Sequence, residues 1–184
     1  RQKLDKGFAD VTEWLLFGSI DFDYISESLL PSLCDKGTNP IKVGKMEYDV
    51  IIVPGCETLR SSTLERLEAF HAAGGQLVFM GDAPSLADAL PSDRGMKLYA
   101  AAQHIPFTQE AVMNAVAPVR MVDIRDSNGA RTDNLLHQLR EDAGGLWLFV
   151  AQGGEPYNKD VPRQQDVQIT VKGAYHARLY DTQS

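Results

Sequence analysis

The apolar and polar positions of this chain repeat with two different periods, which separates helical regions from strands. Between Leu4 and Leu15 the apolar residues recur at spacings of three or four positions, as on one face of a helix, so a helix is expected over residues 1–18. Residues 20–25 then alternate apolar and acidic side chains, which predicts a half-buried strand. A single helical turn is expected within residues 26–33.

The strongest pattern is a strand–helix–strand unit. Residues 49–54 contain an unbroken β-branched run, which is typical of strands buried on both faces of a parallel sheet. Ser62 and Glu65 match a capping box at the start of a helix, and residues 74–75 are two glycines that end it. Residues 76–80 form a second buried strand. The helix face expected to pack on the sheet carries Leu64, Leu67 and Phe70.

Shorter elements are expected on both sides of this unit. Before it, the pattern predicts a strand at residues 41–43 and a turn at residues 44–45. After it, we expect two short helices, a strand and a third helix, at residues 85–90, 96–102, 105–107 and 109–116 respectively.

Alternation with a period of two dominates from about residue 120. It predicts strands at residues 119–124, 135–140, 146–151, 166–171 and 175–180, with a hairpin turn at residues 142–145 and a polar loop at residues 153–164. We therefore expect two domains. Residues 1–120 form an α/β domain with a mainly parallel sheet, and residues 121–184 form a β-rich extension, a partial β-sandwich whose strands pair with one another.

Composition and charge exclude several classes of partner. The chain has 184 residues and a formal net charge of −7 at pH 7, so it lacks the basic surface of a protein that binds nucleic acid or an anionic membrane. No apolar run approaches the roughly 18 residues of a membrane-spanning helix. Two cysteines are too few for a disulfide framework and, with four scattered histidines, for a structural zinc site.

Both ends of the sequence fall inside structural patterns. The chain opens at Arg1 directly in a helical pattern, and it closes at Ser184 just after a predicted strand. We therefore expect a piece of a longer protein. Its compartment is left open, because any export signal would lie upstream.

Cys56 and Glu57 directly follow the first buried strand, at the edge where α/β folds place ligands and nucleophiles. One hypothesis makes Cys56 a nucleophile activated by the start of the following helix. The alternative is a small residue in a tight loop, and it is favoured because a nucleophilic cysteine needs a base. The four histidines have no motif context; they are His71, His104, His137 and His176.

Acidic residues offer two further candidate sites. Asp82 follows the second buried strand, where it either binds a sugar hydroxyl or a metal, or caps a helix that begins near Ser85; the capping role is favoured. Asp21 and Asp23 lie on the same side of one predicted strand. They either serve acid/base chemistry or mark the solvent face of that strand, and the second interpretation is favoured.

The aromatic residues also allow two interpretations. The residues concerned are Trp14, Trp147, Tyr175 and Tyr180. They either line a carbohydrate platform or belong to the core or to a domain interface. The second interpretation is favoured, because large aromatic residues are more often buried. The glycine pair at residues 74–75 lacks the spacing of a phosphate-binding loop. No cofactor and no metal are therefore expected.

Several of these segments together resemble a known family. Residues 48–55, 64–70 and 74–81 look like the glutamine-amidotransferase-like domain found inside large bacterial glycoside hydrolases. The segments are similar to the trimerisation domain of family 42 β-galactosidases, and closer to the middle domain of α-L-rhamnosidase-like glycosidases. Residues 20–25 and the strands after residue 145 also fit. The resemblance implies a flavodoxin-like three-layer α/β domain followed by part of a β-sandwich.

The chain departs from the catalytic members of that class. These carry a Gly-x-Cys-x-Gly turn after the strand that here ends at Met80, but residues 80–83 contain no cysteine, and Cys56 lies one strand too early. A downstream His-x-Glu pair is also missing. The resemblance therefore implies a non-catalytic scaffold or assembly domain. Its partners would be the other domains of the parent enzyme or a second copy, with carbohydrate bound through the parent. The alternatives are a Cys56-dependent amidotransferase-like or hydrolytic enzyme and a carbohydrate-binding module.

Overall fold

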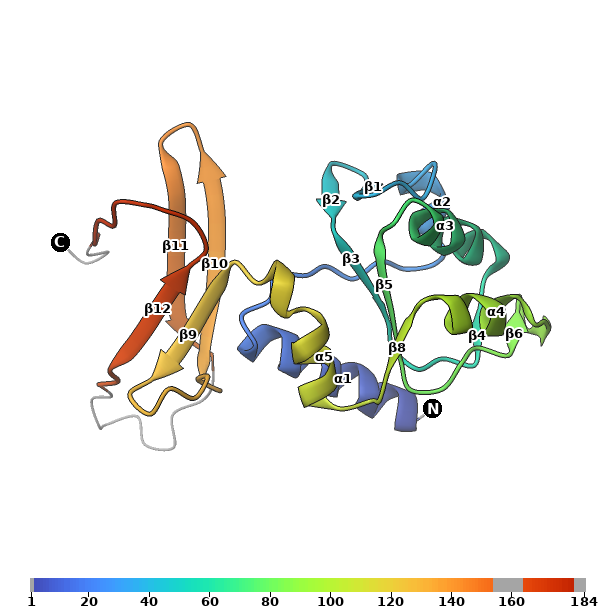
Figure 1. Ribbon diagram of the computed structural model, residues 1–184, viewed down its shortest axis with the longest axis horizontal. Helices are drawn as coiled ribbons and strands as arrows, with labels where there is room; N and C mark the ends of the chain where they lie inside the picture. The colour runs from blue at the N-terminus through green and yellow to red at the C-terminus, as the bar shows by residue number, and fades with distance from the viewer. Residues whose placement is uncertain (1, 154–163, 181–184) are drawn as a thin grey trace.

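The computed structural model describes residues 2–153 and 164–180, and it combines helices with parallel and antiparallel sheets (Figure 1). This mixed α/β content was expected. The helices lie in the first two thirds of the chain and end with a 3-10 turn, η1 (Ala117–Val119), while longer antiparallel strands follow. None of the helices in this described part is both long and apolar enough to cross a bilayer.

The centre of the first part is a three-stranded parallel sheet in the order β3-β5-β8. Its strands are β3 (Val50–Val53), β5 (Gln76–Met80) and β8 (Gln103–Ile105), with Val50 opposite Gln76. The predicted strand–helix–strand unit is confirmed, because α3 (Ser61–Ala72) connects β3 to β5. The expectation that the first strand is buried on both faces is wrong. β3 lies at the edge of the sheet, and only its last residue is buried.

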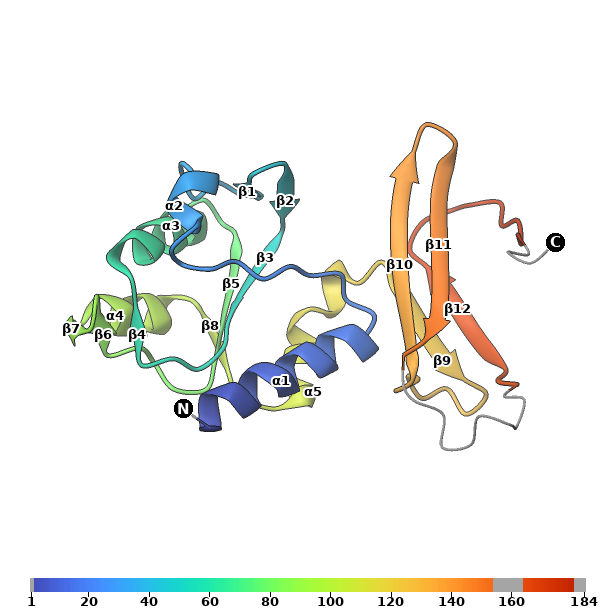
Figure 2. The ribbon, with the colours of Figure 1, turned by 180° about the vertical axis from the view of Figure 1, so that it is seen from behind.

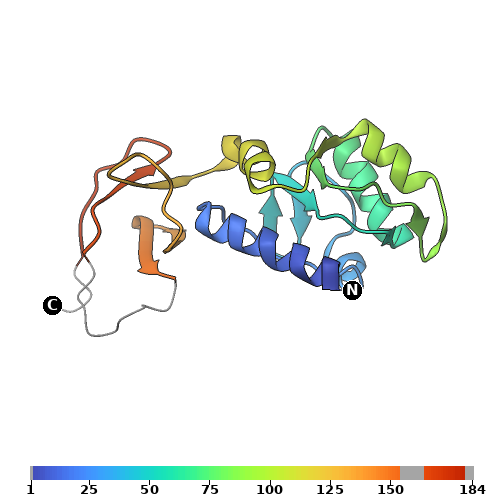
Figure 3. The same cartoon turned by 90° about the horizontal axis from the view of Figure 1, so that it is seen from below.

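Helices pack on both faces of this sheet. Successive strand residues point to opposite sides, and the last four residues of β5 are all buried, so apolar side chains need a cover on each face. Leu77 and Phe79 of β5 join one core with α3 and α4 (Arg94–Ala101). Met80 joins a second core with α1 (Gln2–Phe17) and α5 (Gln109–Ala115). Figure 3 shows α1 and α5 on one side of the sheet and α3 and α4 on the other. The predicted helices at residues 1–18, 96–102 and 109–116 are confirmed, and the strand expected at residues 105–107 lies slightly earlier, as β8.

The start of α3 differs from the predicted capping box. The helix begins at Ser61, and its N-cap residue makes no side-chain capping bond. Instead, the Arg60 N–H donates to a Glu27 carboxylate oxygen at 2.7 Å, and the Ser61 N–H donates to Asp88 Oδ1 at 3.0 Å. Two carboxylates distant in sequence therefore satisfy the free N–H groups at this helix end.

The helix expected at residues 85–90 is wrong. The chain forms a hairpin of β6 (Leu86–Ala87) and β7 (Leu90–Pro91), and β6 pairs in parallel with β4 (Thr58–Leu59). The two turn residues, Asp88 and Ala89, have φ of 50° and 63°, which no right-handed helix allows. The helical composition of this segment is overridden by pairing with β4.

The elements before β3 match the expected ones in part. A short α2 (Leu30–Leu33) and an antiparallel pair, β1 (Ile41–Val43) and β2 (Met46–Tyr48), confirm the turn and the strand predicted there. The strand expected at residues 20–25 is wrong. Its alternation is real, because Ile20 and Phe22 pack on the core of α1 and α5, but its backbone pairs with no strand in the described part.

The second part consists of two separate two-stranded antiparallel sheets. β10 (Leu135–Asp142) and β11 (Gly145–Gln152) form the predicted hairpin, and β9 (Val122–Asp126) pairs with β12 (Val167–Val171). The prediction that these strands pair with one another is confirmed. The strand expected at residues 175–180 is wrong, because these residues adopt no regular structure. Most of the predicted polar loop, residues 154–163, lies outside the described residues.

Candidate functional site

The structure brings together the two turns that carry the candidate residues. Gly55 lies in the turn after β3, and a Cβ atom placed there would meet the Met80 carbonyl oxygen at 3.1 Å and the Asp82 nitrogen at 3.9 Å. The turn holding Cys56 and the turn holding Asp82 are therefore neighbours at the carboxyl edge of the sheet. This is the edge where parallel α/β sheets place their ligands.

The environment of Cys56 opposes its use as a nucleophile. Burial of the thiol, aided by the nearby Glu27 carboxylate, raises its pKa to about 11. Both causes act in the same direction, because a thiolate is disfavoured by loss of water and by a negative neighbour. The thiol is therefore protonated at neutral pH. No hydrogen bond joins Cys56 to a histidine among the residues that the structure describes.

The two candidate carboxylates next to this thiol are both exposed. Glu57 holds the hairpin through its backbone, since its carbonyl oxygen accepts the N–H groups of Ser85 and Leu86 at 3.0 and 3.1 Å. Asp82 follows Gly81, whose carbonyl oxygen accepts the Tyr99 hydroxyl at 2.9 Å. The capping role predicted for Asp82 is wrong, because no helix begins near Ser85. Their role in ligand binding stays a prediction.

The four histidines lie on separate elements. His71 is on α3, and His104 lies on β8 with its ring stacked on Tyr99 at a centroid distance of 4.6 Å. His137 lies on β10 as expected, and only 4% of its side chain is exposed. His176 is exposed and outside any strand, contrary to expectation. The described residues contain no group of three or more His, Cys, Asp or Glu side chains arranged to hold a metal ion.

Asp21 and Asp23, predicted as a pair on one strand face, take different partners. Asp21 Oδ2 lies 3.6 Å from His137 Nε2, and Asp23 accepts the Tyr48 hydroxyl at 2.6 Å. Burial and the Asp23 carboxylate raise the pKa of Tyr48 to about 12. The two carboxylates therefore act as separate contacts between segments, an arrangement that gives no support to paired acid/base chemistry.

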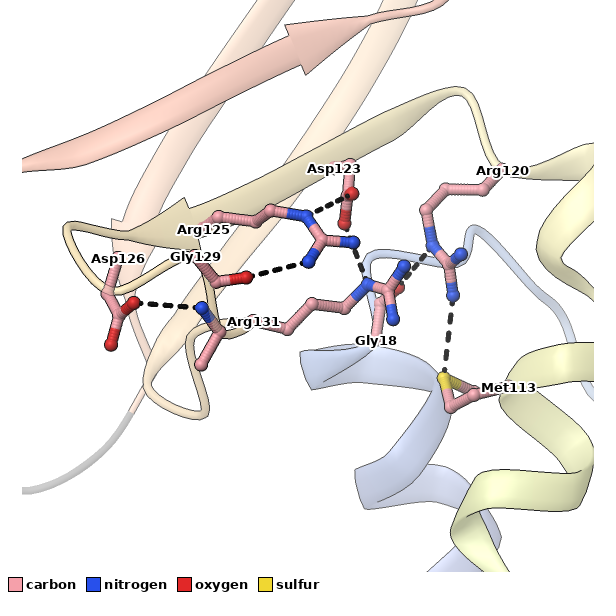
Figure 4. A network of polar contacts seen from close by, with 9 residues as sticks. Gly18, Met113, Arg120, Asp123, Arg125, Asp126, Gly129 and Arg131 are labelled. Carbon is pink, nitrogen blue, oxygen red and sulfur yellow. Dashed lines mark hydrogen bonds and ion pairs between the residues drawn. The ribbon is translucent and has the colours of Figure 1, made fainter.

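Arg120 joins the two parts of the molecule, beside a cluster of charged residues on β9 and its loop (Figure 4). Arg120 donates to the Gly18 carbonyl oxygen at 3.0 Å, at the end of α1. Asp123 on β9 accepts from Arg125 Nε at 2.8 Å and from Arg131 Nε at 2.7 Å. Burial alone would raise the pKa of Asp123, but the bonds from these two arginines outweigh it and lower the pKa. This cluster fixes β9 and its loop; it is a structural junction.

The sequence patterns gave no sign of a cavity that the structure contains. It has a volume of about 700 Å³ and lies between β3 and the segment of residues 19–25. Two wrong expectations hid this cavity. Residues 20–25 were expected to form a strand but pair with no described strand, and β3 was expected to be buried on both faces but has one edge that no described strand covers.

The aromatic candidates divide between the interior and the surface. Trp14 is half-buried and packs against Phe107. The rings of Trp147 and Tyr180 pack on each other at a centroid distance of 5.5 Å. Both residues are nevertheless exposed, Trp147 to 48% and Tyr180 to 63%. Tyr175 is exposed as well. Comparison with protein-family profiles, curated proteins and solved structures found no match for this chain.

Proposed function

We propose that this chain is a non-catalytic scaffold or assembly domain of a bacterial glycoside hydrolase whose other domains cleave O-glycosidic bonds. In this proposal the α/β part has a flavodoxin-like three-layer arrangement, with the β3-β5-β8 sheet between two layers of helices. The segments that resemble the glutamine-amidotransferase-like domain of such enzymes support this assignment, and so does the protonated thiol of Cys56.

An exposed aromatic surface carries the assembly role. The aromatic face, as we call it, consists of Trp147, Phe149 and Tyr180. Leu148 and Val150 of β11 pack inward on the small core of the strands, so Trp147 and Phe149 point outward, and 59% of Phe149 is exposed. Apolar surface of this kind marks a site where another protein surface packs. We infer that the neighbouring domains of the parent, or a second copy, cover it.

Sedimentation velocity of the chain at increasing concentration tests this role. We expect reversible self-association, because the aromatic face and the open strand edges are uncovered in the isolated chain. The double variant Trp147→Ser/Phe149→Ser should sediment as a monomer. Leu90→Ser is the matched control, because Leu90 is 69% exposed but lies on β7. A wild-type chain that stays monomeric at all concentrations would contradict the covering of this face by a second copy.

Two alternatives have their own readouts. The Trp147–Tyr180 pair favours a carbohydrate-binding module, and glycan-array binding that Trp147→Ala abolishes would replace the scaffold by that function. The position of Cys56 after β3 favours an enzyme. Hydrolysis of chromogenic glycosides or of glutamine by the chain, lost in Cys56→Ser, would establish catalysis and overturn the proposal.

A further inference from the structure

β3 has the sequence of an interior strand but the surroundings of an edge strand. All four residues of β3 are β-branched, yet Val50, Ile51 and Ile52 are only half-buried. β5 covers one edge of β3, and no described strand covers the other. All four residues of β3 line a cavity of about 700 Å³.

The cavity occupies the layer of the sheet. Its lining includes α1 and the end of α5 from one helix layer, through Val11, Leu15 and Val116. From the opposite layer it includes Leu30 of α2 and Leu67 of α3. Residues 19–25 also line it, and Figure 2 draws residues 20–25 as a segment without regular secondary structure. The space therefore has the surroundings of a sheet strand, with an apolar layer on each side and a free strand edge beside it.

A buried polar residue also lines this space. Thr63 lines the cavity from α3, is 6% exposed, and has a hydroxyl group with no hydrogen-bond partner among the described atoms.

One end of the cavity is acidic. Glu47 and Asp49 flank Tyr48 at the amino end of β3, and the Asp23 carboxylate accepts the Tyr48 hydroxyl beside them. The two arginines in the lining are engaged elsewhere, since Arg66 donates to the Cys34 carbonyl oxygen and Arg120 to that of Gly18. The end at Tyr48 therefore favours a positively charged group.

We propose that this cavity is a docking slot for one extended polypeptide strand of aliphatic residues with a basic residue at its amino end. The strand pairs in parallel with the free edge of β3 and extends the β3-β5-β8 sheet. Its aliphatic side chains alternate between the two helix layers, and its basic residue lies against Asp23, Glu47 and Asp49. The slot is separate from the aromatic face, so its occupancy and the assembly role fail or hold independently.

Binding of a synthetic peptide tests the slot. The probe is fluorescein-labelled Lys-Lys-Val-Ile-Val-Ile, and its anisotropy is measured against the full chain. One control peptide has glutamates in place of both lysines, which removes the charge match. The other has proline in place of the first valine, which removes a backbone N–H group needed for strand pairing. We expect both controls to bind at least tenfold more weakly. Hydrogen exchange should show the added peptide protecting the amides of Val50–Val53 and leaving those of β10 and β11 unchanged.

A matched pair of variants locates the site. Ile25→Arg places a charge in the cavity lining from a residue that is 43% exposed, and Leu90→Arg places the same charge on distant β7. Only Ile25→Arg should weaken the probe, by tenfold or more. Equal binding of all three peptides, or no protection of β3, would overturn the proposal. Binding of the apolar dye 1-anilinonaphthalene-8-sulfonate without binding of the peptide would show a small-molecule cavity instead and would likewise overturn it.

Discussion

A half-buried thiol beside a carboxylate is held in its protonated form, and Cys56 has both features. Glu27 reaches this site from a segment far away in sequence, so the residue that weakens the cysteine is invisible to a motif search around it. At the residue scale, position after a buried strand is thus a poor guide to reactivity, because burial and charged neighbours set the pKa.

Alkylation by iodoacetamide measures this directly. In a Cys34→Ser background we expect the rate for Cys56 to rise with pH toward a midpoint of about 11. At pH 7.5 the reaction should be roughly a few hundred times slower than that of an ordinary cysteine, whose pKa is about 8.5. Glu27→Gln should move the midpoint to lower pH. A fast reaction at pH 7.5 would contradict this prediction, and the Cys34→Ser/Cys56→Ser variant gives the background.

Asp123 predicts a pH dependence of stability. Its folded-state pKa is lowered, so its contribution is present above the unfolded value of about 3.9 and is lost as the pH falls through the folded-state value. Asp123→Asn should reduce the free energy of unfolding at pH 7 by roughly 1–2 kcal/mol, a range that allows for solvent screening of the partly exposed arginines.

Urea unfolding of the wild type and Asp123→Asn at pH 7 and at pH 3 checks this. The difference between the two proteins should be smaller at pH 3, because the carboxyl group of the unfolded chain is then mostly protonated and part of the contribution of the folded-state charge is lost. Asp93→Asn is the control, since Asp93 pairs with exposed Lys97. A difference that is the same at both pH values would mean that packing, and not charge, holds this junction.

At the scale of elements, α3 shows how tertiary contacts replace local signals. The predicted capping box placed Glu65 at the helix start, yet the N–H groups there are satisfied by Glu27 and Asp88. We therefore expect Asp88→Ala to lower the urea midpoint of unfolding, while the matched change Glu65→Gln leaves it unchanged. The opposite order would restore the capping box as the device that starts this helix.

Elements with a strong hydrophobic period in their own sequence were predicted well. Elements whose secondary structure depends on pairing with a distant strand were not. The β3–α3–β5 unit carries its information locally, in a β-branched run, an apolar helix face and two glycines. Residues 85–90 have helical composition, but Leu86 and Ala87 pair with β4 and form the strand β6, so the segment becomes part of a hairpin. Residues 20–25 have the alternation of a strand and find no strand to pair with in the described chain.

At the scale of the whole molecule, the two parts have unequal cores. The α/β part buries two clusters, one on each face of its sheet, whereas the buried hydrophobic residues in the described strand part are Val122, Ile124 and Leu135. Two-stranded sheets with so few buried side chains are weakly stable on their own. We expect native-state hydrogen exchange to be faster in β10 and β11 than in β5, whose last four residues are all buried.

Exchange measured by residue, at low concentrations of urea, separates the possibilities. If the strand part opens first, the amides of β10 and β11 will share a free energy of opening below that of β5. If both parts exchange together, the molecule unfolds as one unit, and the junction through Arg120 and Asp123 couples the two cores more tightly than their sizes suggest.

The sequence by itself determined the mixed α/β class, the β3–α3–β5 unit, the hairpin of β10 and β11, and the acidic charge, because hydrophobic period and charge are properties of neighbouring residues. Only the tertiary structure decided the protonation of Cys56, the separate partners of Asp21 and Asp23, and the uncovered edge of β3 beside its cavity. Each of these depends on contacts between segments distant in the chain. Burial, hydrogen-bond partners and strand edges exist only once those segments have packed.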